Sequence, residues 1–252
     1  MNKLKIGALI SGGGSNLQAI IDACLASELS AEIVFVGTDN PDAKGLQRAD
    51  AVSIPTFVTD YSKIIKSYRE NVDSVTLPDD VDFEEILKKQ SLFPEGAEPD
   101  KVNAFFKTRI AAEADLIEKM KLYKFDILVL AGFMRTFTPY FIDEVNNGEL
   151  PRIINIHPAL LPSFPGVDGY KDTYDYGCKV GGCTVHFIDY GEDSGPIIGQ
   201  KSFTIEADDT LDDVKKKGLD LEWQLFPECI ELYAQAKIRL ELINGKPVVK
   251  FN

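Results

Sequence analysis

The sequence has little positive charge and few of the residues that most often bind metals. Its 252 residues include 2 His and 4 Cys, and 27 Lys and Arg stand against 40 Asp and Glu, which gives a formal net charge of −13. Nucleic-acid affinity comes chiefly from Lys and Arg, which release counterions from the phosphate backbone. This composition therefore argues against nucleic acid, and equally against an anionic membrane, as a partner.

Long apolar runs and regularly spaced cysteines are also missing. No stretch approaches the roughly 20 apolar residues of a membrane-spanning helix, and the run before Ser11 is too short for a secretory signal. Cys24, Cys178, Cys183 and Cys229 show no CxxC spacing, which favours reduced, buried thiols over a disulfide framework or a zinc site. We expect a cytoplasmic protein without a bound metal.

The sequence does contain the alternation that is typical of an α/β protein. Short apolar runs at 5–10, 33–36 and 127–131 predict strands, and apolar residues with helical spacing follow the first run from Asn16. Further helices are predicted at 43–51, 111–123, 139–145 and from Thr210, and further strands at 153–157, 184–188 and 197–203. This order predicts a Rossmann-like, doubly wound, mostly parallel sheet within a single domain over 1–252.

Two segments depart from the alternation. Residues 61–103 hold 6 Lys and Arg against 10 Asp and Glu, and their prolines, including Pro99, are expected to break any long element. We expect an acidic insertion that forms a helical excursion and is too short for a core of its own. Near the end of the chain, Asn244-Gly245 between two apolar runs predicts a β-hairpin over 238–252.

The first candidate site is the turn Ser11-Gly12-Gly13-Gly14-Ser15-Asn16, which follows the first strand. Backbone N–H groups at the start of the next helix, aided by the helix dipole, form an anion site whose natural occupant is a phosphate. Leu17 stands where a dinucleotide fingerprint or a nucleophile elbow needs glycine, and no P-loop lysine follows. The alternative is a tight turn without a ligand.

Asn155 and His157 form the second candidate site. Residues two apart in a strand point to the same side, so the amide and the imidazole are expected side by side at a carboxyl strand end, where open α/β sheets bind ligands. His157 can act as a general acid or base, and the Asn155 amide can donate to an oxyanion. A structural histidine beside a loop-capping asparagine is the alternative. Any imidazole chemistry has only two positions, His157 and His186.

The third candidate site is the loop 189–196, which carries Asp189, Glu192 and Asp193 among turn-forming residues. A solvated surface loop is the ordinary interpretation. If the loop folds over His157, however, one carboxylate can pair with the imidazole and favour its charged form. The carboxylates lack a regular ligand spacing, so metal binding is not expected.

Three segments in this order carry a specific resemblance: 11–20 (SGGGSNLQAI), 130–135 (LAGFMR) and 155–162 (NIHPALLP), joined by 182–187 (GCTVHF) and 193–196 (DSGP). With them the chain closely resembles the glycinamide ribonucleotide formyltransferase family of purine biosynthesis, apart from residues 61–103. Asn-x-His-Pro followed by Leu-Leu-Pro is typical of the wider superfamily that uses formyltetrahydrofolate. The glycine turn with Ser15-Asn16 indicates the glycinamide ribonucleotide (GAR) branch.

The resemblance implies transfer of a formyl group from the co-substrate 10-formyltetrahydrofolate to the amine of GAR, and it implies no metal. The family's catalytic residues correspond to Asn155, His157 and Asp193. By the same resemblance GAR would contact Gly13, Gly14, Ser15, Asn16 and Glu222; the folate would contact Arg109, Met134, Arg135, Thr136, Phe137, Asn155 and Asp189; and Thr184 and His186 would support the site. Residues 1–130 would form the phosphate-binding half and 131–237 the folate-binding and catalytic half, in a monomer or homodimer that acts on small molecules.

Departures and alternatives accompany this resemblance. The loop after Gly166 lacks the histidine that family members usually have, and residues 219–221 lack the polar side chains often found before the Glu222 position. A formyltetrahydrofolate hydrolase shares the catalytic residues but generally has a further N-terminal domain, whereas here the first strand is expected at Lys5. A methionyl-tRNA formyltransferase would need a basic RNA-binding extension. A catalytically silent phosphate-binding protein is the remaining alternative, and the intact Asn155, His157 and Asp193 argue against it.

Overall fold

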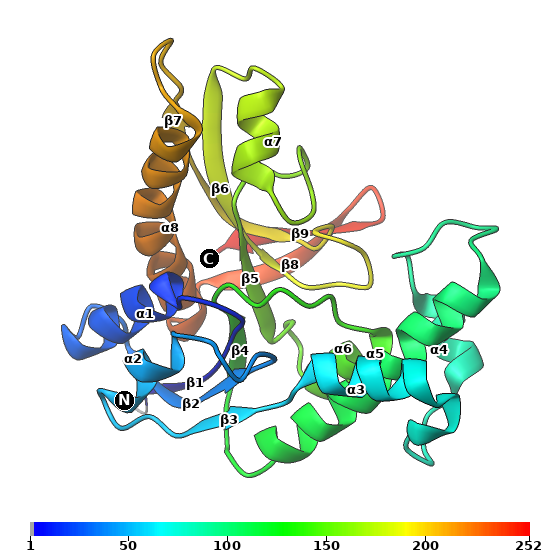
Figure 1. Cartoon of the computed structure of the whole chain (residues 1–252). Helices are drawn as coiled ribbons and strands as arrows, with labels where there is room; N and C mark the ends of the chain where they lie inside the picture. The colour runs from blue at the N-terminus through cyan, green and yellow to red at the C-terminus, as the bar shows by residue number, and fades with distance from the viewer. Residues whose placement is uncertain (1–2) are drawn as a thin grey trace.

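The computed structural model describes residues 3–252. Among them, seven strands form one sheet in the order β3-β2-β1-β4-β5-β6-β7 (Figure 1). Their bounds are β1 (Leu4–Ile10), β2 (Ala31–Thr38), β3 (Thr56–Val58), β4 (Ile127–Leu130), β5 (Ile153–His157), β6 (Val180–Phe187) and β7 (Ile197–Thr204). The first five pair in parallel, whereas β6 and β7 are antiparallel. The predicted Rossmann-like, mostly parallel sheet is confirmed.

The central strands are buried on both faces, which explains their continuous apolar sequence. In β4, Ile127 and Val129 pack into the core on one side of the sheet, and Leu128 and Leu130 pack into the core on the other. This alternation follows from the two-residue period of a strand. The sheet therefore separates two apolar cores.

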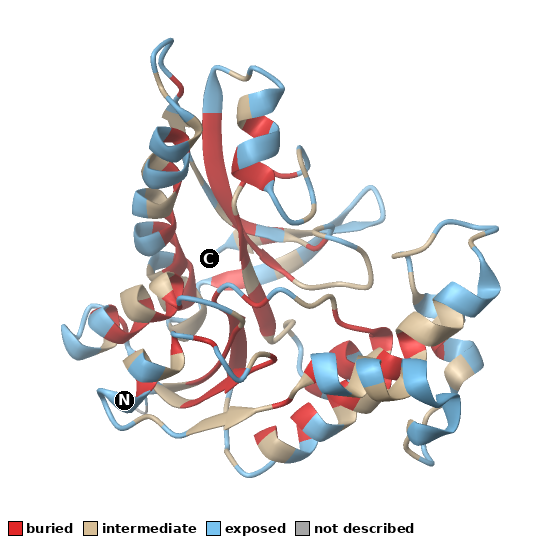
Figure 2. Cartoon of the chain, in the orientation of Figure 1, coloured by how far each residue is buried: buried red, intermediate tan, exposed pale blue. Residues whose placement is uncertain are grey.

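Helices cover both faces of the sheet (Figure 2). One core includes residues of α1 (Ser15–Leu25) and α8 (Leu211–Ala234), and the other includes residues of α5 (Pro99–Met120) and α6 (Pro139–Val145). Thr210 begins α8 as its N-cap: its hydroxyl accepts from the Asp213 backbone N–H, and the Asp213 carboxylate accepts from the Thr210 backbone. This capping box makes the start of α8 readable from the sequence. The shorter elements are α2 (Leu46–Asp50), α3 (Tyr61–Glu70), the 3-10 turn η1 (Val72–Ser74), α4 (Phe83–Lys89) and α7 (Gly169–Asp175).

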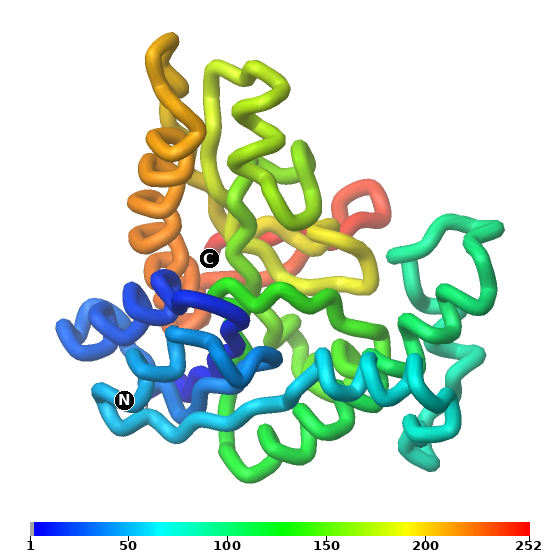
Figure 3. Tube along the Cα trace, in the orientation of Figure 1, coloured from blue at the N-terminus to red at the C-terminus, as the bar shows by residue number. Residues whose placement is uncertain are grey.

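The excursion after β3 consists of α3, η1 and α4, and it leads directly into α5 (Figure 3). One expectation about it was wrong. Pro99 does not break a helix but begins α5, because the missing N–H of a proline is harmless in the first helical turn. The helix predicted from 111 therefore starts at Pro99, and the insertion boundary at 103 falls inside it. As expected, the excursion does not form a core by itself: its buried Ile86 packs on Phe106 and Ile110 of α5, which lie outside 61–103.

The end of the described chain forms the predicted hairpin. Strands β8 (Ile238–Ile243) and β9 (Lys246–Phe251) pair antiparallel, and Asn244 and Gly245 both have positive φ, at 52° and 78°. Positive φ at both turn residues is what favours Asn-Gly in a two-residue hairpin loop. By contrast, the segment between β5 and β6, which was expected to be a loop, contains α7.

The cysteines, the apolar helices and the metal-binding residue types can be located in the structure: Cys183 and Cys229 are buried, and Cys24 and Cys178 are partly buried. All four cysteines are free, and burial raises the pKa of the Cys183 and Cys229 thiols to about 12. Within residues 3–252, no helix is long and apolar enough to cross a membrane. The same residues contain no cluster of three or more His, Cys, Asp or Glu side chains placed to hold a metal ion.

Candidate active site

A cleft of about 390 Å³ lies where β4 and β5 end, between the loop 189–193 and helices α7 and α8. Carboxyl strand ends are where open α/β sheets bind ligands. Ten of the sixteen residues that the resemblance assigns to the site line the cleft: Asn16, Met134, Arg135, Thr136, Phe137, Asn155, His157, Asp189, Asp193 and Glu222. The remaining six do not line it: Gly13, Gly14, Ser15, Arg109, Thr184 and His186.

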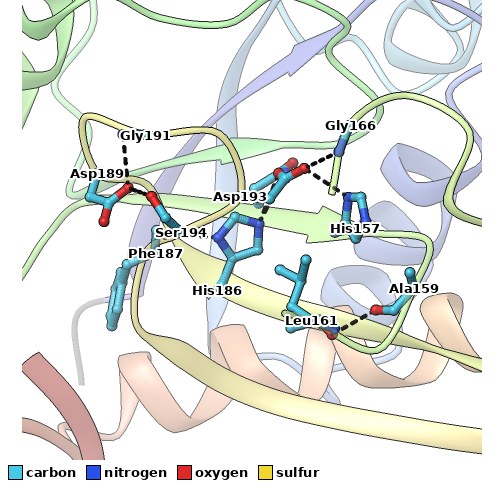
Figure 4. Close-up of polar contacts among 12 residues, drawn as sticks. His157, Ala159, Leu161, Gly166, His186, Phe187, Asp189, Gly191, Asp193 and Ser194 are labelled. Atoms are coloured by element: carbon cyan, nitrogen blue, oxygen red, sulfur yellow. Dashed lines mark hydrogen bonds and ion pairs between the residues drawn. The ribbon is translucent and has the colours of Figure 1, made fainter. Parts of the chain in front are cut away.

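His157 is buried at the end of β5, and both of its ring nitrogens face acceptors, of which Figure 4 shows Asp193. Nε2 lies 2.8 Å from the Phe164 carbonyl oxygen, and Nδ1 lies 3.2 Å from Oδ2 of Asp193. A carbonyl only accepts, so Nε2 carries a hydrogen, and the carboxylate offers an acceptor to Nδ1 as well. Each ring nitrogen of His157 therefore has an acceptor within hydrogen-bonding distance.

His186 holds Asn155 in place rather than facing the cleft. Its Nδ1 donates to the Phe187 carbonyl oxygen at 2.9 Å, so Nε2 is free to accept from the Asn155 amide nitrogen, 3.3 Å away. Burial lowers the pKa of His186, which favours this neutral tautomer. The Asn155 amide therefore has a fixed orientation, with its second N–H available to a ligand in the cleft. Asn155, His157, His186 and Asp193 are called the histidine cluster below.

Asp193 connects the parts of the histidine cluster. Its Oδ2 accepts from the Gly166 backbone N–H at 2.8 Å, in addition to facing His157, and its Oδ1 lies 3.6 Å from Nε2 of His186. The residue has a φ of 50°, in the left-handed region that side chains other than glycine, Asn and Asp seldom adopt. Such conformations persist where the surrounding structure holds them, often at functional sites.

The loop that carries Asp193 is braced from two sides. Within it, Oδ1 of Asp189 accepts from the Ser194 hydroxyl at 2.6 Å and from the Gly191 backbone. From the excursion, the Ser91 backbone N–H donates to the Tyr190 carbonyl at 3.2 Å. From α6, the Asp143 carboxylate accepts from the Tyr190 hydroxyl at 2.5 Å and from Lys89 of α4 at 3.0 Å. The acidic excursion therefore contacts the loop beside the candidate active site.

The glycine turn lies between β1 and α1 and is closed by backbone contacts. Gly14 has a φ of 68°, and a Cβ there would lie 2.9 Å from the Gly45 Cα, so both its conformation and its space require glycine. Arg48 donates through Nε to the Gly13 carbonyl at 2.8 Å. No sequence pattern indicated Arg48, because its position beside the turn depends on tertiary packing.

Asn16 and Glu222 are 206 positions apart in the sequence and meet at one wall of the cleft. The Asn16 amide donates to Oε2 of Glu222 at 2.7 Å, and the Tyr170 hydroxyl donates to Oε1 at 2.6 Å. Burial raises the pKa of Glu222, and the two hydrogen bonds act in the opposite direction. Tyr170 was not singled out from the sequence, where its segment resembled a loop.

Thr184 has a structural place in the site. Its hydroxyl donates to the Ala159 carbonyl at 2.7 Å and accepts from the Leu161 backbone and the Gln200 side chain, both at 3.0 Å. These bonds use its one donor and both of its lone pairs. Thr184 therefore holds the loop that follows His157, and its hydroxyl is not directed to the cleft.

A second set of polar residues involves α3 and α5 and is called the arginine cluster. It consists of Asp39, Tyr61, Arg109, Glu113 and Arg135. Arg135 donates to Asp39 at 2.5 Å, and the Thr138 backbone N–H donates to Glu113 at 2.8 Å. Arg109 stacks on Phe105, with 4.9 Å from the guanidinium carbon to the ring centre. Burial lowers the pKa of Arg109 and raises that of Glu113 to about 7.

Comparison with known proteins agrees with this geometry. Residues 4–230 match the formyl transferase family. A phosphoribosylglycinamide formyltransferase from Bacillus subtilis is 31% identical over 227 residues, which are 90% of this chain and 93% of that protein. The glycinamide ribonucleotide transformylase 1 structure from Symbiobacterium toebii superposes with a TM-score of 0.73 at 31% identity, covering 99% of this chain and 94% of that one.

A formyltetrahydrofolate deformylase structure from Pseudomonas syringae shares the fold, with a TM-score of 0.70 at 20% identity, and it covers 99% of this chain and 66% of that one. The fold and the cleft thus define an α/β transferase of one-carbon groups, and the chain belongs to the formyl transferase family. Within that family, the similar relatives of matching length are phosphoribosylglycinamide formyltransferases.

Proposed function

We propose that the chain transfers the formyl group of 10-formyltetrahydrofolate to the amine of GAR, and so makes formylglycinamide ribonucleotide in de novo purine biosynthesis. The observation that carries the proposal is the histidine cluster, in which Asn155, His157 and Asp193 meet in one cleft. The relatives of matching length support the choice of substrates.

The chemistry follows from the donors of the cluster. The neutral amine of GAR attacks the formyl carbon, and the carbonyl oxygen becomes the oxyanion of a tetrahedral intermediate. The free amide N–H of Asn155 and the Nε2–H of His157 would donate to that oxygen, which would replace the Phe164 carbonyl as the acceptor of His157. Asp193 would hold the imidazolium. Collapse breaks the bond to N10, which receives the proton that the amine gives up.

The same proposal places the two substrates along the cleft. The GAR phosphate would lie on the backbone N–H groups from Gly13 to Asn16, where Arg48 adds a positive charge beside the α1 start. Its glycinamide would reach Glu222. The folate would lie along 134–137, beneath the loop 189–193, with Arg109 and Arg135 on its side of the sheet. The repulsion expected from a net charge of −13 would be offset by these local donors.

We also propose the organisation that goes with this function: one domain over 1–252, with a phosphate-binding half over 1–130 and a folate-binding and catalytic half over 131–237. The protein would act in the cytoplasm, as a monomer or homodimer, without a metal. The four cysteines are free, which is what a reducing compartment would give.

One experiment tests the proposal against its alternatives. The protein is mixed with 10-formyltetrahydrofolate in the presence and absence of GAR, and deformylation of the folate is followed together with formation of formylglycinamide ribonucleotide. We expect consumption only when GAR is present. Consumption that is independent of GAR would indicate a hydrolase, and no consumption under either condition would indicate a binding protein.

A further inference from the structure

The Glu222 carboxylate accepts two hydrogen bonds, one from α1 and one from α7. It is 4% exposed, and its two carboxylate oxygens accept separately, Oε2 from Asn16 at 2.7 Å and Oε1 from Tyr170 at 2.6 Å. Asn16 belongs to α1 and Tyr170 to α7, so two helices fix the carboxylate of a third. A carboxylate has about four lone-pair positions, and two remain for a ligand.

The position of the Tyr170 ring depends on a glycine in α8. A Cβ on Gly218 would lie 2.1 Å from Cζ of Tyr170 and 2.4 Å from its hydroxyl oxygen, far inside any real contact. Gly218 lies four residues before Glu222, on the same face of the helix. Glycine in a helix interior costs about 0.5–1 kcal/mol relative to alanine. Because Gly218 has no Cβ, the phenol ring can pack directly against α8 with its hydroxyl beside Glu222.

Simple core packing does not account for the hydroxyl. The ring of Tyr170 packs with Val214 and Ile205 in an apolar cluster, which a phenylalanine would fill equally well. Burial and the neighbouring Glu222 raise the pKa of Tyr170, so the phenol stays a donor to the carboxylate. The titratable groups that face Glu222 are Tyr170, His157 from β5 and Cys183 from β6. Packing therefore explains the ring of Tyr170, but the hydroxyl needs another explanation.

We propose that Tyr170 is a positioning residue, which together with Asn16 holds the Glu222 carboxylate ionised and aimed at the acceptor amine. This inference rests on the proposed function for the identity of the amine. The free lone pairs of Glu222 and the buried, unpartnered Oδ1 of Asn16 are all acceptors, so the complementary group is an N–H donor. The glycinamide amine of GAR has this chemistry. Tyr170 acts through Glu222 and does not touch the reacting atoms.

Tyr170→Phe tests the proposal, because it removes one oxygen and keeps the ring. We expect kcat/KM for GAR to fall about tenfold, the scale of a hydrogen bond to a charged group, while KM for 10-formyltetrahydrofolate is unchanged. The acidic limb of the pH profile for GAR should move to higher pH, because Glu222 loses a bond that favours its ionised form. Tyr174→Phe, on the same helix and beside the same apolar cluster, is the matched control and should match the wild type.

Two further measurements complete the test. In the Glu222→Gln background, Tyr170→Phe should cost much less than in the wild type, because the charged partner is gone. A carbon-13 NMR titration of the Glu222 carboxyl in the free protein should show a higher pKa in Tyr170→Phe than in the wild type, whatever the substrate is. An unchanged titration would overturn the positioning role. A shifted titration in a protein that does not formylate GAR would keep the positioning role and reject the proposed function.

Discussion

The histidine cluster and the arginine cluster both border the same sheet, and they differ in how their polar atoms are satisfied. In the histidine cluster each imidazole has a carbonyl or carboxylate partner at a defined nitrogen. In the arginine cluster, Oδ1 of Asp39, the hydroxyl of Tyr61 and Nε of Arg109 are buried without a hydrogen-bond partner. A satisfied polar group is preorganised, whereas an unsatisfied one lowers stability.

This difference separates two consequences of mutation. Substitutions in the histidine cluster should reduce transfer because they remove placed donors and acceptors. Some substitutions in the arginine cluster remove a hydroxyl without a partner or a carboxyl that is costly to ionise in a buried place. These should leave the free energy of unfolding unchanged or raise it.

His157→Ala has the largest expected effect. It removes the N–H donor to the oxyanion, and loss of a general acid or base typically lowers rates by about 10²–10⁴-fold. We expect turnover with both substrates to fall on this scale, with an unchanged far-ultraviolet circular dichroism spectrum. Turnover close to that of the wild type would sink the assignment of His157.

Asp193→Asn should lower turnover by about 10²-fold, because the imidazolium loses the carboxylate that favours its charged form. Asn tolerates the φ of 50° at this position and can still accept from the Gly166 backbone, so the loop should keep its shape. Steady-state kinetics give the readout. A variant as active as the wild type would mean that the charge of Asp193 plays no part.

Glu113→Gln should change how stability depends on pH. The pKa of Glu113 is raised from 4.5 to about 7 by burial, so the folded protein keeps a proton that the unfolded chain releases. This contribution to stability is therefore fully present below pH 4.5 and is lost as pH rises through 7, which amounts to about 3 kcal/mol at roughly 1.4 kcal/mol per unit. The Gln variant should lack this loss. Urea unfolding at pH 5 and pH 8 measures the difference, and equal pH dependence in both proteins would contradict it.

Tyr61→Phe has the smallest expected effect. The Tyr61 hydroxyl is fully buried and has no partner, so its removal should leave the free energy of unfolding unchanged or raise it by about 1 kcal/mol. Thermal unfolding compares it with Tyr170→Phe, which removes a bonded hydroxyl and should lower stability. A clear loss of stability in Tyr61→Phe would show that this hydroxyl has a partner in solution.

Local patterns in the sequence were sufficient where a local cause determines the structure. The apolar run of β4, the capping box at Thr210 and the Asn244-Gly245 turn each depend on neighbours in the chain, and each was predicted correctly. The start of α5 was missed because Pro99 was interpreted as a breaker rather than as a first-turn residue.

Side-chain partners depend on packing between distant elements, and the sequence showed them poorly. The approach of Asp193 to His157 was expected from the resemblance and from charge, and their atoms do meet. The bond from Tyr170 to Glu222 was not expected, although Gly218 inside a helical pattern indicates a close approach of some neighbour. The burial of Arg109 away from the cleft also follows only from tertiary structure.

The excursion is connected to the loop that carries Asp193 by the Ser91–Tyr190 backbone bond and by Asp143 of α6, which accepts from both Lys89 and Tyr190. Linkage between two such elements is reciprocal. A ligand that binds the loop should therefore raise the free energy needed to separate the excursion from α5 and α6. A more stable excursion should in turn raise the affinity of the loop for that ligand. The rate at which a protease cleaves residues 71–98 should therefore fall as a ligand fills the cleft.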